Sequence, residues 1–98
     1  MTALTNQTKQ KTIMAKVIKA DGHTYETRPK NGKDFQLEEL KEIVGGYIEI
    51  VYLPDEKIMV VNEEGKLYHL PVNMQATHLY GYEVIVGDVL VCDKNQVK

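Results

Sequence analysis

The sequence predicts an α+β fold: a small, mainly antiparallel sheet with one amphipathic helix and one short helix. Three observations lead to this prediction. Two β-forming runs flank Asp21-Gly22, a typical hairpin turn pair. Near the middle of the chain, apolar residues recur at helical spacing. Further short β-forming runs follow, divided by Pro and Gly. The 98 residues suffice for one domain.

The first ordered element is expected to be an N-terminal β-hairpin. Residues 15–20 form a short β-forming run, and residues 23–27 return with Thr and Tyr, which favour strands. Asp21-Gly22 between them suits a type I′ turn, in which both central residues have positive φ. Residues 28–33 then form a loop.

A short amphipathic helix of about ten residues is expected next, because apolar residues follow its period. Asp34 suits the N-cap, and Gly45 suits a left-handed C-cap. Four apolar side chains would share the buried face: Leu37, Leu40, Ile43 and Val44.

The densest β-forming stretch is predicted to be an antiparallel three-strand meander of residues 47–53, 58–61 and 66–70. Pro54 suits a type I turn in the first connection. Gly65 suits the left-handed position that closes the second turn. Both faces of residues 47–53 are largely apolar, so this strand is expected to be central and covered on both sides.

The last part of the chain is predicted to hold a short helix and a final strand. Asn73 suits the N-cap of the helix, and Gly81 suits its end. The side chains expected to face inward are those of Ala76, Leu79 and Tyr80. After an extended segment, residues 89–92 form a fully apolar strand.

The domain organisation follows from the changes in composition. Residues 1–12 are polar and aperiodic and are expected to be a disordered leader. Residues 13–93 form the single domain, and residues 94–98 a polar tail. Met14 offers an alternative start to Met1.

The composition favours a soluble, cytoplasmic protein. Cys92 is the single cysteine, which excludes an internal disulfide. The chain lacks both an apolar run of membrane-spanning length and a signal-peptide core. Its net charge of −2 combines +4 in residues 1–34 with −6 in residues 35–98. Because phosphate binding needs clustered Lys and Arg, neither nucleic acid nor membrane is expected as a partner.

No catalytic, metal-binding or cofactor-binding constellation is predicted. The three histidines and Cys92 lack the short ligand spacings of zinc sites. Glu63 and Glu64 are neighbours on a turn, whereas glycosidase carboxylates face each other across a cleft. Gly45-Gly46 follows a helix, the reverse of a phosphate-binding loop. We therefore expect a protein that is not an enzyme.

Tyrosines and acidic residues give the signal that favours a binding function. The chain has six tyrosines beside one phenylalanine, and tyrosine suits binding surfaces. Residues 36–65 carry eight acidic residues and two lysines, which favours a basic partner. The candidate binding surface comprises Tyr47, Glu49, Val51, Leu53, Glu63, Glu64 and Tyr68.

Several short pieces of the chain also match a known family in order and spacing. They are Val44-Gly45-Gly46-Tyr47, residues 62–67, Leu70-Pro71-Val72-Asn73, Ala76 and Gly87-Asp88-Val89. Together, over residues 14–92, they resemble a small family designated domain of unknown function 3846. The resemblance implies a setting, an accessory protein of a bacterial phage or mobile element. It brings no catalytic residue to carry over.

We therefore expect a small non-enzymatic binding protein that acts on a host protein. The alternative is a nucleotide-like small-molecule binder that uses tyrosine stacking in a pocket lined by Tyr47, Tyr68 or Tyr82. An enzyme is the least favoured class. A homo-oligomer is left open, because an exposed sheet edge or the second face of residues 47–53 could pair with another copy.

Overall fold

The computed structural model describes residues 15–97. Within this range the strands are β1 (Ala15–Ile18), β2 (Thr24–Thr27), β3 (Ile48–Leu53), β4 (Lys57–Asn62) and β5 (Val89–Asp93). The helices are α2 (Leu37–Val44), α3 (Met74–Tyr80) and the 3₁₀ helix η1 (Lys94–Gln96). The strands form one antiparallel sheet in the order β2-β1-β5-β4-β3, which confirms the α+β class. The predicted leader and Met14 lie outside the described residues.

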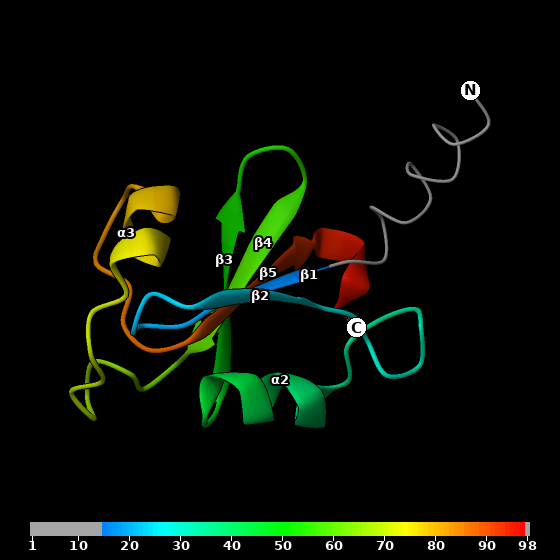
Figure 1. The fold of residues 1–98 in the computed structure, drawn as a ribbon, viewed down its shortest axis with the longest axis horizontal. Helices are drawn as coiled ribbons and strands as arrows, with labels where there is room; N and C mark the ends of the chain where they lie inside the picture. Colours follow the sequence, from blue (N-terminus) through cyan, green and yellow to red (C-terminus); the bar gives the residue numbers. More distant parts are fainter. Residues whose placement is uncertain (1–14, 98) are drawn as a thin grey trace.

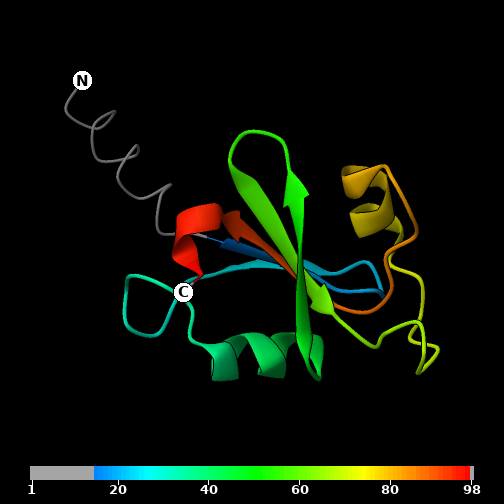
Figure 2. The same cartoon turned by 180° about the vertical axis from the view of Figure 1, so that it is seen from behind.

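The two helices α2 and α3 lie on opposite faces of the sheet (Figures 1 and 2). On the α2 face, Leu40 and Val44 pack in a buried cluster with side chains of β1, β4 and β5. On the α3 face, Ala76 packs in a second buried cluster with Ile18, Val61 and other residues of the sheet. Each strand of the sheet interior therefore supplies apolar side chains to both layers.

The N-terminal hairpin forms as expected, but its turn differs from the prediction. The Lys19 N–H donates to the His23 carbonyl at 2.8 Å, and the Gly22 N–H donates to the Lys19 carbonyl at 3.0 Å. Gly22 has positive φ (101°), whereas Asp21 does not. The loop is thus the three-residue type, in which a turn is closed by one left-handed residue, rather than type I′.

Helix α2 begins later than predicted. Its N-cap is Gln36, whose N–H donates to the Glu39 carboxylate at 3.0 Å. The Asp34 carboxylate instead accepts from the Gln36 and Asn31 side-chain amides, at 2.9 and 3.1 Å. Gly45 takes the expected left-handed C-cap, with φ 83°.

The shifted start of α2 changes which side chain fills the core. Leu37, predicted to be buried, is 55% exposed. Phe35 is only 2% exposed, and its N–H donates to the Gln96 carbonyl at 2.6 Å. An aromatic side chain just before the helix buries more apolar surface than Leu37 could from the first turn, so Phe35 takes the inward position.

Strand β3 lies at the edge of the sheet, which corrects the prediction that it is central (Figure 2). The expected third strand of the meander, residues 66–70, does not form; residues 63–69 make consecutive turns. Within them, the Tyr68 N–H donates to the Glu64 carbonyl at 3.0 Å and the Leu70 N–H to the Gly65 carbonyl at 2.9 Å. These bonds satisfy the backbone locally, so within residues 15–97 β3 pairs with β4 alone, and β4 is the strand buried on both faces.

Two turn predictions within this region are also wrong. Asp55 and Glu56 both have φ of 63°, so the β3–β4 turn resembles the primed type and Pro54 is its first residue. Gly65 does not have positive φ. It is required for space instead, because a Cβ there would lie 2.8 Å from Cγ2 of Val86.

Helix α3 has the caps that were predicted. The Asn73 side chain accepts from the Ala76 N–H at 3.0 Å, and Gly81 has the left-handed φ of 84°. Ala76 is fully buried and Tyr80 packs on the core, but Leu79 is half exposed. A helix of two turns has room for one row of inward side chains, and Ala76 and Tyr80 occupy it.

The end of the chain belongs to the domain. Strand β5, predicted to be the last apolar strand, lies at the centre of the sheet between β1 and β4. The following residues, predicted to be a polar tail, include η1, in which Gln96 is buried. Among the described residues, neither α2 nor α3 nor η1 has the length and apolar character needed to cross a bilayer.

Candidate functional site

Three residues of the predicted surface meet in one pocket of about 270 Å³ at the edge of the sheet. They are Glu49, Val51 and Glu63, and this cavity is called the acidic pocket below. Leu53 lines a different pocket, and neither Tyr47, Tyr68 nor Glu64 lines the acidic pocket. The fold therefore brings three residues of the predicted surface together and places the other four apart from them.

The floor of the acidic pocket comes from β3 and β4. Glu49 pairs with Val61 across the two strands, and Val51 lies two residues further along the same face. The Asn62 side chain, buried at the end of β4, donates to the Val44 carbonyl at 3.1 Å and accepts from the Glu64 N–H at 2.8 Å. These bonds fix the turn that presents Glu63 at the pocket.

One wall of the acidic pocket comes from residues 83–86, far away in sequence. Helix α3 holds this wall through Thr77, whose hydroxyl accepts from the Ile85 N–H at 2.9 Å. The Ile85 carbonyl accepts from the Asn73 N–H at 2.8 Å. The wall was predicted only as an extended segment. No local pattern marks it, because its role depends on its return to β4.

The pocket carries excess negative charge. Lys66 Nζ lies 3.0 Å from the Glu83 carboxylate, so these two charges offset each other. Within residues 15–97, neither Glu49 nor Glu63 has an ion-pair or hydrogen-bond partner for its carboxylate. Two carboxylates thus face a half-enclosed space whose other lining includes Val51, Val61 and residues 84–86. Such a lining suits a cationic group on an apolar stem.

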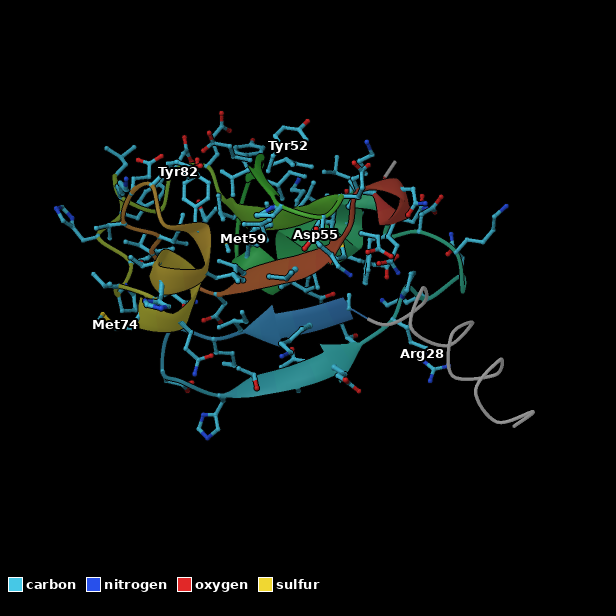
Figure 3. All side chains as sticks on the ribbon, turned by 90° about the horizontal axis from the view of Figure 1, so that it is seen from above. Arg28, Tyr52, Asp55, Met59, Met74 and Tyr82 are labelled. Atoms are coloured by element: carbon cyan, nitrogen blue, oxygen red, sulfur yellow. The ribbon has the colours of Figure 1, made fainter. Side chains whose placement is uncertain are left out.

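Exposed tyrosines lie along the edge of the sheet that is formed by β3. Tyr52 is 73% and Tyr82 86% exposed, and Figure 3 places both on the side of the sheet where β3 lies. The Tyr82 ring packs edge-on against Tyr80, with 5.3 Å between ring centroids. Near the start of β3, Lys41 Nζ lies 5.3 Å from the centre of the Tyr47 ring. Tyr82 was not part of the predicted surface.

The pockets give the tyrosine-stacking alternative no support. Among four pockets lined by residues 15–97, two include a tyrosine, Tyr52 in one and Tyr25 in the other. Tyr47, Tyr68 and Tyr82 line none of these four pockets. Exposed rings without an enclosing wall can contact a broad surface, but they do not sandwich a base.

A larger hollow of about 530 Å³ lies on the α3 face, where Leu53, Val91 and Leu79 contribute apolar surface. Cys92 is also near it, but its side chain packs in the cluster on the α2 face. Burial raises the pKa of the Cys92 thiol to about 12. A thiol that stays protonated is a poor nucleophile, so this residue acts as a small core side chain.

The titratable side chains form no metal site in the part of the chain that the structure describes. No three His, Cys, Asp or Glu side chains of residues 15–97 come close enough to share a metal ion. The acidic pocket holds carboxylates at one side and apolar carbons at the other, a set suited to an organic cation.

Comparison with known proteins gives one match. The family model described as Domain of unknown function (DUF3846) matches residues 14–97. This range includes every strand and helix that the structure describes. Neither the curated proteins nor the solved structures that were compared gave a match.

Proposed function

Since the chain belongs to the DUF3846 family, whose description assigns no activity, we propose a function from the acidic pocket: a non-enzymatic binding module that recognises a basic segment of another protein. One observation carries the proposal. The carboxylates of Glu49 and Glu63 have no partner among the described residues and line a pocket of mixed character, in which Val51, Val61 and Val84 supply apolar surface.

The physical argument rests on complementarity. A Lys or Arg head group between Glu49 and Glu63 gains charge-assisted hydrogen bonds, while its aliphatic stem covers Val51 and Val61. The exposed ring of Tyr82 comes directly before Glu83 of the pocket wall, whereas the exposed ring of Tyr52 stands on the opposite face of β3; both supply rigid contact area along this edge of the sheet. The excess of negative charge in residues 35–98 favours association with a basic partner.

The setting is part of the proposal. The resemblance noted in the sequence implies an accessory protein of a bacterial phage or mobile element, and the partner is then a cytoplasmic protein of the host. A host segment of this kind needs only an accessible basic side chain flanked by apolar residues. Recognition of this type requires no catalysis and no cofactor.

A random-peptide display library, panned on the immobilised protein, tests the proposal. We expect the selected peptides to be enriched in Lys or Arg, with one basic position shared among them. The double substitution Glu49→Gln and Glu63→Gln should weaken binding of a selected peptide at least about tenfold. Fluorescence polarisation measures the dissociation constants.

A matched control removes the same charge elsewhere. The double substitution Glu38→Gln and Glu42→Gln changes two exposed carboxylates of α2, away from the acidic pocket. This control should retain the affinity within about twofold, since distant surface charges act weakly in salt. Equal losses for both double variants, or peptides without basic residues, contradict the proposed function.

A further inference from the structure

We propose that the basic segment binds as an added β-strand along the free edge of β3, with one Lys or Arg directed into the acidic pocket. This inference rests on the proposed function and specifies its geometry. It depends on three observations: which backbone groups of β3 face outward, how β3 differs from the other edge strand, and where Glu49 stands on that edge.

The backbone of β3 offers unpaired groups at alternate residues. The Tyr47 carbonyl accepts from the Glu63 N–H at 2.8 Å, so residue 47 bonds toward β4. Antiparallel pairing alternates, and residues 49, 51 and 53 therefore also bond toward β4. The N–H and C=O groups of Ile48, Ile50 and Tyr52 then point away from the sheet, where residues 15–97 place no other strand. Each of the three residues offers one donor and one acceptor to an incoming strand.

The sheet has two edges, and they differ in composition. Strand β2 has four residues, Thr24–Thr27, of which Tyr25 alone is aromatic or apolar. Strand β3 has six residues, of which Glu49 alone is charged. Long apolar edge strands are open to strand addition unless lysine, proline or a bulge interrupts them. Nothing of that kind interrupts β3 between Ile48 and Leu53.

The register of an added strand brings its side chains to the acidic pocket. In antiparallel pairing, the partner residue opposite Glu49 stands on the same face, with Cβ atoms about 5 Å apart. A Lys or Arg at that position lies beside Glu49 and reaches toward Glu63 in the pocket. The next partner residue on this face lies opposite Val51 and should be apolar.

The other face of the added strand meets a second surface. Ile50 and Tyr52 line a groove of about 480 Å³ on the α2 face, together with Ile58 and Val97. A partner residue opposite Ile50 projects over this groove, so it should be β-branched or aromatic. The expected partner motif is therefore a short extended run with apolar residues on both faces and one basic residue.

A second copy of this chain is a weaker occupant of the edge. Self-pairing about a two-fold axis at Ile50 places Glu49 opposite Val51 of the other copy and leaves both acidic pockets unfilled. Shifting that axis to Glu49 brings two like charges face to face, which destabilises the pair. A strand from another protein that carries a basic residue fills the acidic pocket and places no second carboxylate opposite Glu49.

Backbone methylation of the peptide tests strand addition directly. The probe is the tightest-binding basic peptide from the library selection, made in two forms that carry N-methyl groups at alternate residues. One form loses the N–H groups that face β3 and should bind at least about tenfold more weakly. The other form loses only outward N–H groups and should bind within about threefold of the parent peptide.

Proline substitution tests the same edge from the protein side. Tyr52→Pro removes an N–H that faces outward, so the bonds to β4 remain and the edge tolerates it. Tyr52→Thr removes the same ring but keeps the N–H, and it serves as the matched control. We expect Tyr52→Pro to bind the peptide at least about fivefold more weakly than Tyr52→Thr. Circular dichroism checks that both variants fold. If either variant is unfolded, the two methylated peptides, which need only the unaltered protein, test strand addition instead.

The outcomes separate this inference from the proposed function. Equal binding of the two methylated peptides, with the Glu49 and Glu63 dependence intact, overturns strand addition and leaves the proposed function standing. Loss of the dependence on both glutamates overturns both. A dimer of the protein alone, measured by analytical ultracentrifugation and abolished by Tyr52→Pro, assigns the edge to a second copy and also overturns the inference.

Discussion

The two faces of the sheet are closed in different ways. On the α2 face, one amphipathic helix places Leu40 and Val44 on the apolar side chains of the strands. On the α3 face, a two-turn helix covers one end, and irregular chain between residues 63 and 88 covers part of the remainder (Figure 1). The α2 face is closed mainly by side-chain packing, together with the buried hydrogen bond from Asn62 to the Val44 carbonyl, and the α3 face depends more on specific hydrogen bonds.

The buried amide of Asn73 illustrates the second kind of closure. Its Nδ2 donates to the carbonyls of Ile18 and Gly87, at 2.9 and 2.8 Å, while its Oδ1 caps α3. One side chain thus ties the helix to β1 and to the segment before β5. The acidic pocket lies on this face, between β3, β4 and the irregular wall of residues 83–86.

The largest expected effect is the loss of this tie. Asn73→Ala removes a helix cap and two buried hydrogen bonds, to the carbonyls of Ile18 and Gly87, so it should lower the free energy of unfolding by about 4 kcal/mol. Urea denaturation measures the change. Asn95→Ala, at an exposed position of η1, is the control and should cost less than about 0.5 kcal/mol. A cost near that of Asn95→Ala would show that the amide does not hold the α3 face.

The α2 face should respond to the size of its buried side chains. Leu40 is buried and Leu37 is mainly exposed, although both are leucines of the same helix. Leu40→Ala should cost about 3 kcal/mol, because it leaves a cavity, and Leu37→Ala less than about 1 kcal/mol. Urea denaturation of both variants measures this difference. Similar costs for the two would mean that the helix packs with the face that the sequence predicted.

The third expected effect is a pH dependence from the α2 cluster. The pKa of Cys92 is about 12 in the folded protein against 9.0 for a free thiol. Because the folded pKa is the higher one, the unfolded chain loses the proton first, and stability falls as pH rises above 9. At pH 10 the loss should be about 1.4 kcal/mol relative to pH 8.

Comparison with a variant isolates the contribution of the thiol, since other groups also titrate at this pH. Cys92→Ala should lower stability at pH 8 but lack the Cys92 part of the decline toward pH 10. Denaturation curves of both proteins at the two pH values give the difference. Parallel declines would mean that the thiol reaches solvent in the folded state.

The smallest expected effect concerns the β3–β4 turn, which joins two strands shared by both faces. Asp55 has φ of 63°, a left-handed conformation that glycine adopts without strain. Asp55→Gly should therefore stabilise the protein by about 0.5 kcal/mol. Lys33→Gly, in a loop position without positive φ, should destabilise it slightly. Thermal melts of the two variants should shift in opposite directions; a shift downward for both would rule out relief of turn strain.

On both faces of the sheet, local sequence patterns predicted the features that depend on neighbours in the chain and missed those that depend on distant contacts. The helical repeat ending at Gly45, the hairpin of β1 and β2, the Asn73 cap and the apolar run of β5 all depend on neighbours in the chain. The position of β3 in the sheet does not depend on its neighbours in the chain. Residues 66–70 have the composition of a strand, yet backbone bonds within residues 63–70 compete for the same groups.

The candidate site shows the same division. Sequence analysis placed Glu49, Val51 and Glu63 in one surface from charge and strand composition, and they do meet in a pocket. It also included Tyr68 and Leu53, which lie elsewhere, and it missed Glu83 and Lys66. The missing residues come from turns whose position is set by contacts far away in sequence.

By itself, the sequence determined the α+β class, the helix caps at Gly45, Asn73 and Gly81, and the negative charge of residues 35–98. These properties follow from propensity, periodicity and charge, which act between residues close in the chain. The tertiary structure alone decided the strand order, the exposure of the β3 edge and the wall of the acidic pocket. Each of these depends on which distant segment satisfies a strand's backbone groups, and for β3 the described chain supplies such a segment on one side only.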